Sequence, residues 1–134
     1  MLATGHLSIP EIRPLVKAAK KRGVKRLYLN HPEYIVNGTV EEQVELAKLG
    51  VYIEHLAIFM FAMWPTQCGI DGVVKMIKAV GPEKTVLASD LGQVHNPPPH
   101  EGMRMFLQVL MEKGIPKKHL KIMVQDNPSY LLNI

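Results

Sequence analysis

Cysteine is almost absent from this chain, since Cys68 is the only one among 134 residues. One cysteine cannot form a disulfide within the chain, and it cannot supply a zinc motif built from several thiolates. Aromatic residues are also few, at 6%, and none interleaves with the basic cluster between Lys17 and Arg26. Because single-stranded nucleic acid needs such a stacking platform, we interpret this cluster as a solvated helix end and expect no nucleic-acid partner.

Long hydrophobic runs are missing as well. The longest, residues 56–64, is about half of the roughly 20 residues that a membrane-spanning helix requires. No charged segment precedes an apolar stretch at the amino terminus, as it would in a secretory signal peptide. With 47% hydrophobic and 21% charged residues, the composition is that of an ordinary globular domain. We therefore expect a soluble, cytoplasmic protein with one domain over residues 1–134 and no membrane partner.

Short apolar runs alternate with segments of helical periodicity along the chain. Runs of this kind, bounded by turn residues, are typical of buried strands, and we expect them within residues 1–4, 24–30, 51–54 and 85–90. Capping boxes that begin at Ser8 and Thr39 predict the starts of two helices. Two more helices are expected before Gly81 and Gly114, and short ones over residues 116–124 and from Asn127, which we interpret as a cap. This alternation predicts a parallel sheet with helical crossovers.

The apolar segment 56–64 stands apart from this alternation and stops at Pro65. An extended strand, a loop at the mouth of a pocket and a surface for a partner are all compatible with it. Because exposed apolar patches of this size usually mark contacts, we expect it to be buried against another subunit or domain.

Polar residues follow the first, second and fourth predicted strands at His6, His31 and Asp90. The carboxyl ends of parallel strands face one side of a sheet, where α/β proteins place their chemistry. Imidazole nitrogen and carboxylate oxygen suit zinc and other divalent ions, so we interpret these residues as metal ligands. The alternative role for Asp90 is that of a base that deprotonates the water. The alternative for each histidine is a hydrogen bond within its own loop, without a metal. Pro32 predicts that His31 leaves its strand in extended geometry.

Three further residues are candidates for binding a substrate: Glu54, Gln93 and His95. Glu54 and His55 are neighbours at the end of the third strand, so alternation places only one of them on the side of the site. Gln93 and His95 lie in the loop of residues 92–99 that follows Asp90. Exposed histidines in loops commonly have no functional role, and this is the alternative for His95.

Four short motifs together resemble a known family: Thr4-Gly5-His6-Leu7-Ser8, Asn30-His31-Pro32, Ser89-Asp90, and Asn127-Pro128-Ser129-Tyr130-Leu131-Leu132. In this order they resemble the second half of a metal-dependent hydrolase of the amidohydrolase superfamily, close to its phosphotriesterase-like and TatD-like branches. The resemblance implies strands five to eight of a TIM-type (β/α)8 barrel, a partial barrel with short C-terminal helices. It implies metal ligands at His6 and His31 and the strand-eight aspartate at Asp90. The implied cofactor is a divalent metal, zinc first, with manganese, iron or nickel as alternatives.

The chain departs from this family in one large respect. The family also uses an H-x-H pair from strand one and a lysine or carboxylate from strand four, whereas this chain contains no H-x-H and begins at what would be strand five. We therefore expect a fragment, a split-gene product or one half of an assembly. Half-barrels leave an unpaired strand at each edge, which two-fold pairing would cover.

The resemblance predicts a metal-dependent hydrolase that uses an activated water on an ester, amide or phosphoester of a small-molecule substrate. A homo-oligomer, or a second chain that supplies the N-terminal half-barrel, would complete it. Two alternatives stay open. One is a non-catalytic half-barrel with a structural or subunit-forming role, and the other is a binding domain without a metal, in which His6 and His31 hold an anionic ligand.

Overall fold

The chain folds around a four-stranded parallel sheet in the computed structural model, which describes residues 1–34, 36–61 and 68–134. The strands are β1 (Leu2–Ala3), β2 (Leu27–Leu29), β3 (Val51–Leu56) and β4 (Thr85–Ala88), and they lie side by side in chain order. Every pairing between neighbours is parallel. All the carboxyl ends therefore reach one edge of the sheet, and the predicted parallel α/β architecture is confirmed.

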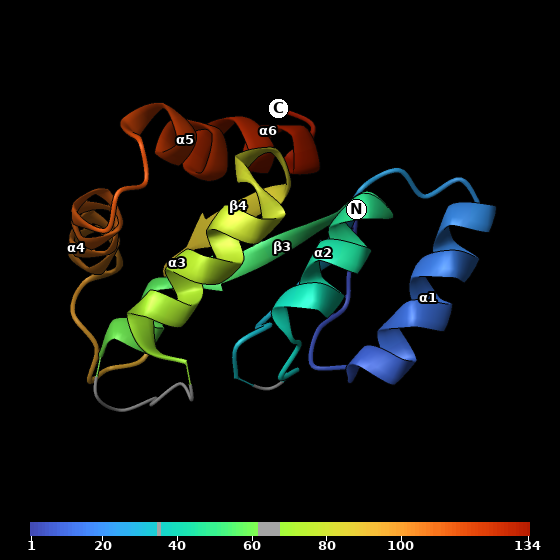
Figure 1. Cartoon of the computed structure of the whole chain (residues 1–134), viewed down its shortest axis with the longest axis horizontal. Helices are drawn as coiled ribbons and strands as arrows, with labels where there is room; N and C mark the ends of the chain where they lie inside the picture. Colours follow the sequence, from blue (N-terminus) through green and yellow to red (C-terminus); the bar gives the residue numbers. More distant parts are fainter. Residues whose placement is uncertain (35, 62–67) are drawn as a thin grey trace.

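Helices connect the strands and cover one face of the sheet. Figure 1 shows α2 (Val40–Lys48) and α3 (Gly69–Val80) in front of the strands, with α1 (Ile9–Lys21) to the right of α2 and α4 (Pro99–Glu112) to the left of α3. Short 3₁₀ helices, η1 (Ala57–Met60) and η2 (Pro82–Lys84), follow β3 and precede β4. The predicted capping box of α2 forms, because Thr39 Oγ1 accepts from the Glu42 N–H and the Glu42 carboxylate accepts from the Thr39 N–H.

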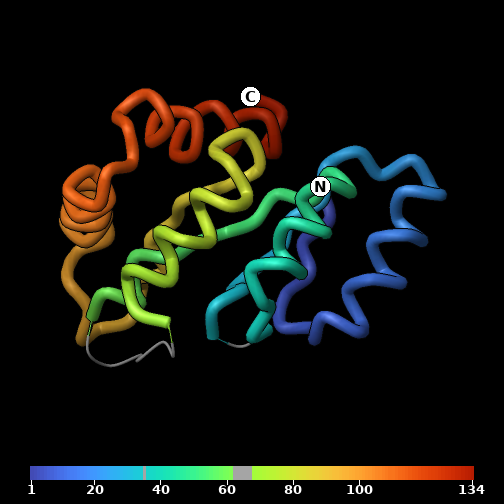
Figure 2. The backbone as a smooth tube through the Cα atoms, viewed as in Figure 1, coloured from blue at the N-terminus to red at the C-terminus, as the bar shows by residue number. Residues whose placement is uncertain are grey.

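The C-terminal segment is one uninterrupted helical run of α5 (Lys117–Lys121), the π-helical turn η3 (Ile122–Asp126) and α6 (Asn127–Leu132). The interpretation of Asn127 as a cap is wrong, because its backbone is helical with φ −66° and ψ −47°. Its side-chain amide instead donates to the carbonyl oxygens of Pro82 and Thr85, at 2.7 and 2.6 Å. These carbonyls lie at the start of β4, so α6 crosses the amino end of the sheet, as the red end of the chain in Figure 2 shows.

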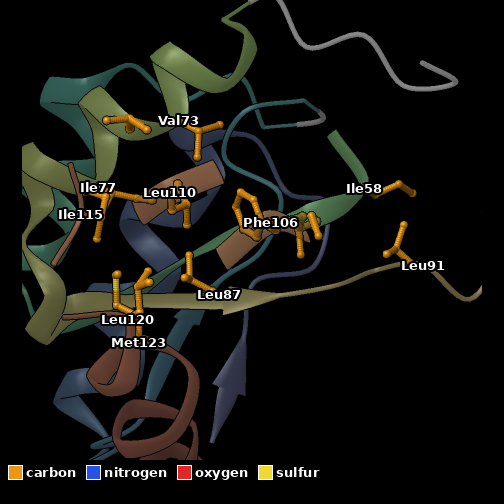
Figure 3. Close-up of a cluster of buried hydrophobic side chains, with 13 residues drawn as sticks. Ile58, Val73, Ile77, Leu87, Leu91, Phe106, Leu110, Ile115, Leu120 and Met123 are labelled. Carbon is orange, nitrogen blue, oxygen red and sulfur yellow. The ribbon is translucent and has the colours of Figure 1, made fainter. Parts of the chain in front are cut away.

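The helix-covered face of the sheet holds two apolar clusters. One joins Leu29 of β2 and Ile53 of β3 to Ile12 of α1 and Leu46 of α2. The other surrounds Phe106, which is fully buried. Figure 3 shows the second cluster, where residues from β4, α3, α4 and the C-terminal helices meet: Ile58, Val73, Ile77, Leu87, Leu91, Phe106, Leu110, Ile115, Leu120 and Met123.

The opposite face, which we call the inner face, carries Tyr28, Tyr52, Glu54 and Val86, which the strand register places on one side. Its buried cluster is small, and Leu131 of α6 packs there against Tyr52 and Val86. Beside this contact lies an apolar pocket of about 340 Å³ whose lining includes Tyr28, Val86 and Leu131. The inner face is thus covered at the amino end of the strands and open beside α6.

The expectation that the apolar segment 56–64 is buried against another subunit or domain is wrong for residues 56–58. Leu56, Ala57 and Ile58 are 1%, 0% and 3% exposed and belong to the Phe106 cluster. Residues 59–61 are partly buried against the same cluster. Residues 56–58 are therefore buried within their own chain and not against another subunit. The physical reason is that β3 continues beyond Glu54 and carries the chain into the core. Residues 62–64 lie outside the described residues. Within the described ranges, no helix has both the length and the apolar character to cross a membrane.

Candidate active-site pocket

A pocket of about 260 Å³ lies where the strands end at their carboxyl side, and four of the predicted site residues line it. His6 comes from the loop after β1, His31 from the loop after β2, and Asp90 and Gln93 from the loop after β4. The pocket forms because parallel strands in chain order bring these loops to one edge. Tyr34, Ile58 and Phe59 complete the lining. The sequence did not single out Tyr34, whereas Ile58 and Phe59 belong to the apolar segment 56–64, for which a loop at the mouth of a pocket was one interpretation.

The two imidazoles lie close together. The ring centroids of His6 and His31 are 4.9 Å apart, and the rings are tilted by 51°. His6 and Asp90 are exposed, whereas His31 is half-buried. Solvent therefore reaches the pair, and a ligand has access to both rings.

His31 and Asp90 share a left-handed backbone, each with φ of +50°. The prediction that His31 leaves its strand extended is wrong. Its N–H donates to Glu54 Oε2 at 3.2 Å, and its carbonyl oxygen accepts from the N–H groups of Tyr34 and Val36 at 3.4 and 3.3 Å. These bonds turn the loop back over the strand end. Left-handed backbone costs about 1–2 kcal/mol outside glycine, and such strain gathers at functional sites.

Glu54 is a buried carboxylate that binds protein groups on the inner face. It is 7% exposed, and it accepts from the Tyr28 hydroxyl at 2.7 Å, from Asn30 Nδ2 at 3.3 Å and from the His31 N–H at 3.2 Å. Glu54 is not among the residues that line the pocket. The geometry therefore gives this predicted substrate-binding residue a positioning role for the loop of His31.

A hydrogen-bonded chain extends from Glu54 to the ends of β2 and β1. The side-chain oxygen of Asn30 accepts from the Gly5 N–H at 3.1 Å, and the Asn30 N–H donates to Thr4 Oγ1 at 3.2 Å. Because His6 follows Gly5 and His31 follows Asn30, these bonds hold the backbones of the two histidines relative to each other. The sequence reasoning missed Asn30 and Thr4 as positioning residues, although each stands directly at a predicted strand end within a quoted motif.

His55 and Glu33 form a buried pair on the helix-covered face. Both side chains are fully buried, and His55 Nδ1 forms a short hydrogen bond with Glu33 Oε1. Glu33 Oε2 and His55 Nε2 have no hydrogen-bond partner in the described part of the chain. As alternation predicted, Glu54 and His55 use opposite faces of β3. Together they hold the loop that carries His31 and Tyr34 from both sides.

The remaining wall of the pocket is aromatic and polar. The rings of Tyr34 and Phe59 lie 6.1 Å apart between centroids. Gln93 lines the pocket, and its side-chain oxygen accepts from Asn96 Nδ2. His95 is exposed and does not belong to the lining, so this structure brings Gln93 to the pocket and leaves His95 outside it.

The donors on this chain fit a divalent metal in part. His6 and His31 offer two imidazoles side by side, and Asp90 lines the same pocket. Among the described residues, however, no group of three or more His, Cys, Asp or Glu side chains is placed to hold a metal ion. Catalytic zinc sites take three protein ligands, so the described residues of this chain do not complete such a site by themselves.

The fold and the pocket define an α/β protein whose pocket at the strand ends is lined by both polar and apolar side chains. A family of unknown function, DUF6282, has a model that matches residues 1–54. The matched part contains β1, α1, β2 and α2 and ends within β3 at Glu54. Comparisons with curated proteins and with solved structures gave no match.

Alkaline pH is expected to destabilise the fold through Tyr28. Burial, and secondly the Glu54 carboxylate, raise the pKa of Tyr28 well above its ordinary value. The folded state thus keeps the phenol proton above about pH 10, where the unfolded chain loses it. The stabilisation is therefore complete below about pH 10 and declines as the pH rises further.

Urea unfolding at about pH 8 and about pH 10.5 measures this effect. Tyr28→Phe is the control, because it retains every other titrating group, including Tyr52, whose pKa burial also raises. The wild-type chain should lose more stability than Tyr28→Phe between the two conditions. Equal losses in the two proteins would contradict the assignment.

Proposed function

We propose that this chain is about half of a (β/α)8 barrel and carries part of the active site of a metal-dependent hydrolase. The parallel sheet in chain order, with helices on one face, is what a half-barrel of strands five to eight requires. The motifs that resemble the amidohydrolase superfamily lie at the strand ends and in α6.

One observation carries the proposal: His6, His31 and Asp90, from three separate strand ends, line one solvent-accessible pocket. The backbones of the two histidines are fixed through Asn30 and Glu54, which is the support that paired ligands need. In this proposal, His6 and His31 supply two donors to a divalent ion, zinc first. Asp90 supplies a carboxylate that accepts a proton from water, and Tyr34 and Gln93 contact a small-molecule ester, amide or phosphoester.

Zinc binding by the imidazole pair is the first expected result. The purified wild-type chain, incubated with zinc and then desalted, should retain near-stoichiometric metal by elemental mass spectrometry. His6→Ala/His31→Ala should retain little, because it removes both nitrogen donors. His100→Ala/His119→Ala is the matched control, since it removes the same number of imidazoles away from the pocket and should bind zinc like the wild type.

Equal zinc in all three proteins would contradict the metal site. Two other functions then take its place, and calorimetry with a small carboxylate or phosphate separates them. Heat of binding that depends on His6 and His31 would indicate a binding domain for an anionic ligand. No binding would indicate a non-catalytic half-barrel with a structural role.

A further inference from the structure

We infer that the substrate of this pocket carries an apolar group of about the size of a phenyl ring, next to the polar group on which the chemistry takes place. The inference rests on the proposed function, and it adds the class of substrate and the residues that select it. Three features carry it: the apolar contribution of β3 to the pocket, the fixed positions of two aromatic rings, and the size and charge of the lining.

The segment after β3 makes an apolar wall in the pocket. The loops after β1, β2 and β4 bring His6, His31 and Asp90 to the lining. From the segment after β3, by contrast, η1 brings Ile58 and Phe59. Because β3 lies between β2 and β4 in the sheet, this wall enters the pocket between the strand before His31 and the strand before Asp90. A molecule that contacts both the imidazoles and Asp90 is therefore expected to contact the apolar wall as well.

The hydrophobic core holds this wall in place. Ile58 is 3% exposed and belongs to the Phe106 cluster (Figure 3), and Phe59 packs against the same cluster. The Ile58 N–H donates to the carbonyl oxygen of Ser89 at 3.0 Å, which ties η1 to the residue before Asp90. The wall is thus formed before a ligand arrives, as the apolar surfaces of small-molecule pockets usually are.

Tyr34 adds a second aromatic ring from the loop after β2. Its ring centroid lies 6.1 Å from that of Phe59, and the two planes are tilted by 47°, which is within the usual range for an aromatic pair. The Tyr34 N–H donates to the His31 carbonyl oxygen at 3.4 Å, so the ring belongs to the turn that carries an imidazole. Tyr34 is 39% exposed. An apolar group of a ligand that covers this ring would remove it from water, which favours binding.

The size and charge of the lining limit the substrate further. A volume of about 260 Å³ lies below the roughly 300–1,000 Å³ of pockets for drug-sized ligands. No lysine or arginine is among the described residues that line the pocket, whereas proteins that hold several phosphates use these cations. The pocket therefore favours a small molecule with one polar and one apolar group over a nucleic acid or a polyphosphate.

Methylphosphonate and phenylphosphonate test the inference, because they share one charged group and differ in the apolar group. Their binding to the isotope-labelled chain is measured by nuclear magnetic resonance titration, with and without zinc, at a pH where both are doubly charged. The wild-type chain should bind phenylphosphonate about tenfold or more tightly than methylphosphonate, since even one methylene changes affinity for an apolar pocket by about this factor. Equal affinity for the two probes, or no binding of either, would overturn the inference.

Variants of the two rings test which residues select the apolar group. Tyr34→Ala and Phe59→Ala should each reduce the preference for phenylphosphonate by about threefold or more, whereas Tyr34→Phe keeps the ring and should keep the preference. Because Phe59 also packs on the core, Tyr34→Ala decides the test if circular dichroism shows Phe59→Ala unfolded. Tyr130→Ala is the matched control, since it removes a half-exposed phenol ring outside the lining. A preference that Tyr34→Ala leaves unchanged would overturn the assignment.

Zinc retention separates this inference from the proposed function. A preference for phenylphosphonate that depends on Tyr34, in a chain that retains no zinc, would support the apolar wall and contradict the metal-dependent hydrolase alone. Zinc held by His6 and His31 without this preference would contradict the substrate class and leave the proposed hydrolase standing.

Discussion

Glu33→Ala is expected to lower the free energy of unfolding by about 3–5 kcal/mol, because it leaves His55 buried without its partner. Both side chains are fully buried, and each already has one atom without a hydrogen bond in the described part of the chain. Removal of the carboxylate leaves Nδ1 of His55 unpaired as well. Water does not readily replace it, because both side chains are fully buried. Urea unfolding followed by circular dichroism measures the change.

A double variant separates the cost of breaking this pair from the value of having it. Glu33→Leu/His55→Leu removes both unpaired polar atoms of this pair at once, and such apolar replacements of buried pairs are often neutral or stabilising. It should therefore be more stable than either Glu33→Ala or His55→Ala. A double variant that is the least stable of the three would show that the pair itself contributes most of the stability at this position.

Glu54→Ala is expected to have the second large effect, on both stability and the site. It removes three hydrogen bonds to a buried carboxylate, from Tyr28, Asn30 and His31, and should cost about 2–4 kcal/mol. Because Glu54 holds the backbone of His31, zinc affinity at the imidazole pair should also fall by about tenfold or more. Denaturant unfolding and zinc titration by calorimetry measure the two effects.

Glu83→Ala is the matched control for Glu54→Ala. It also removes a carboxylate, but from an exposed position next to β4, and should change stability by less than about 0.5 kcal/mol. Glu54→Gln keeps an acceptor for Tyr28 and should lie between the two. A folded Glu54→Ala variant with wild-type zinc affinity would contradict the positioning role of Glu54. The prediction that Glu54 contacts the substrate directly would then be the better interpretation.

The sequence alone determined the elements and the edge of the sheet where the site lies. Capping boxes, helical periodicity and short apolar runs act over a few residues, so the order of strands and helices followed from local chemistry. The same order predicted that His6, His31 and Asp90 would meet, because parallel strands end on one side. These inferences needed no knowledge of which distant side chains touch.

The tertiary structure alone decided what the buried polar residues do. Asn127 has the residue type of a cap, yet it bonds to carbonyl groups more than forty positions away, at the start of β4. Glu54 is a carboxylate at a strand end, which predicted contact with a substrate. Its oxygens instead accept hydrogen bonds from Tyr28, Asn30 and His31. The physical reason is that a buried polar group takes the partners that the fold brings to it, and those partners are distant in the sequence.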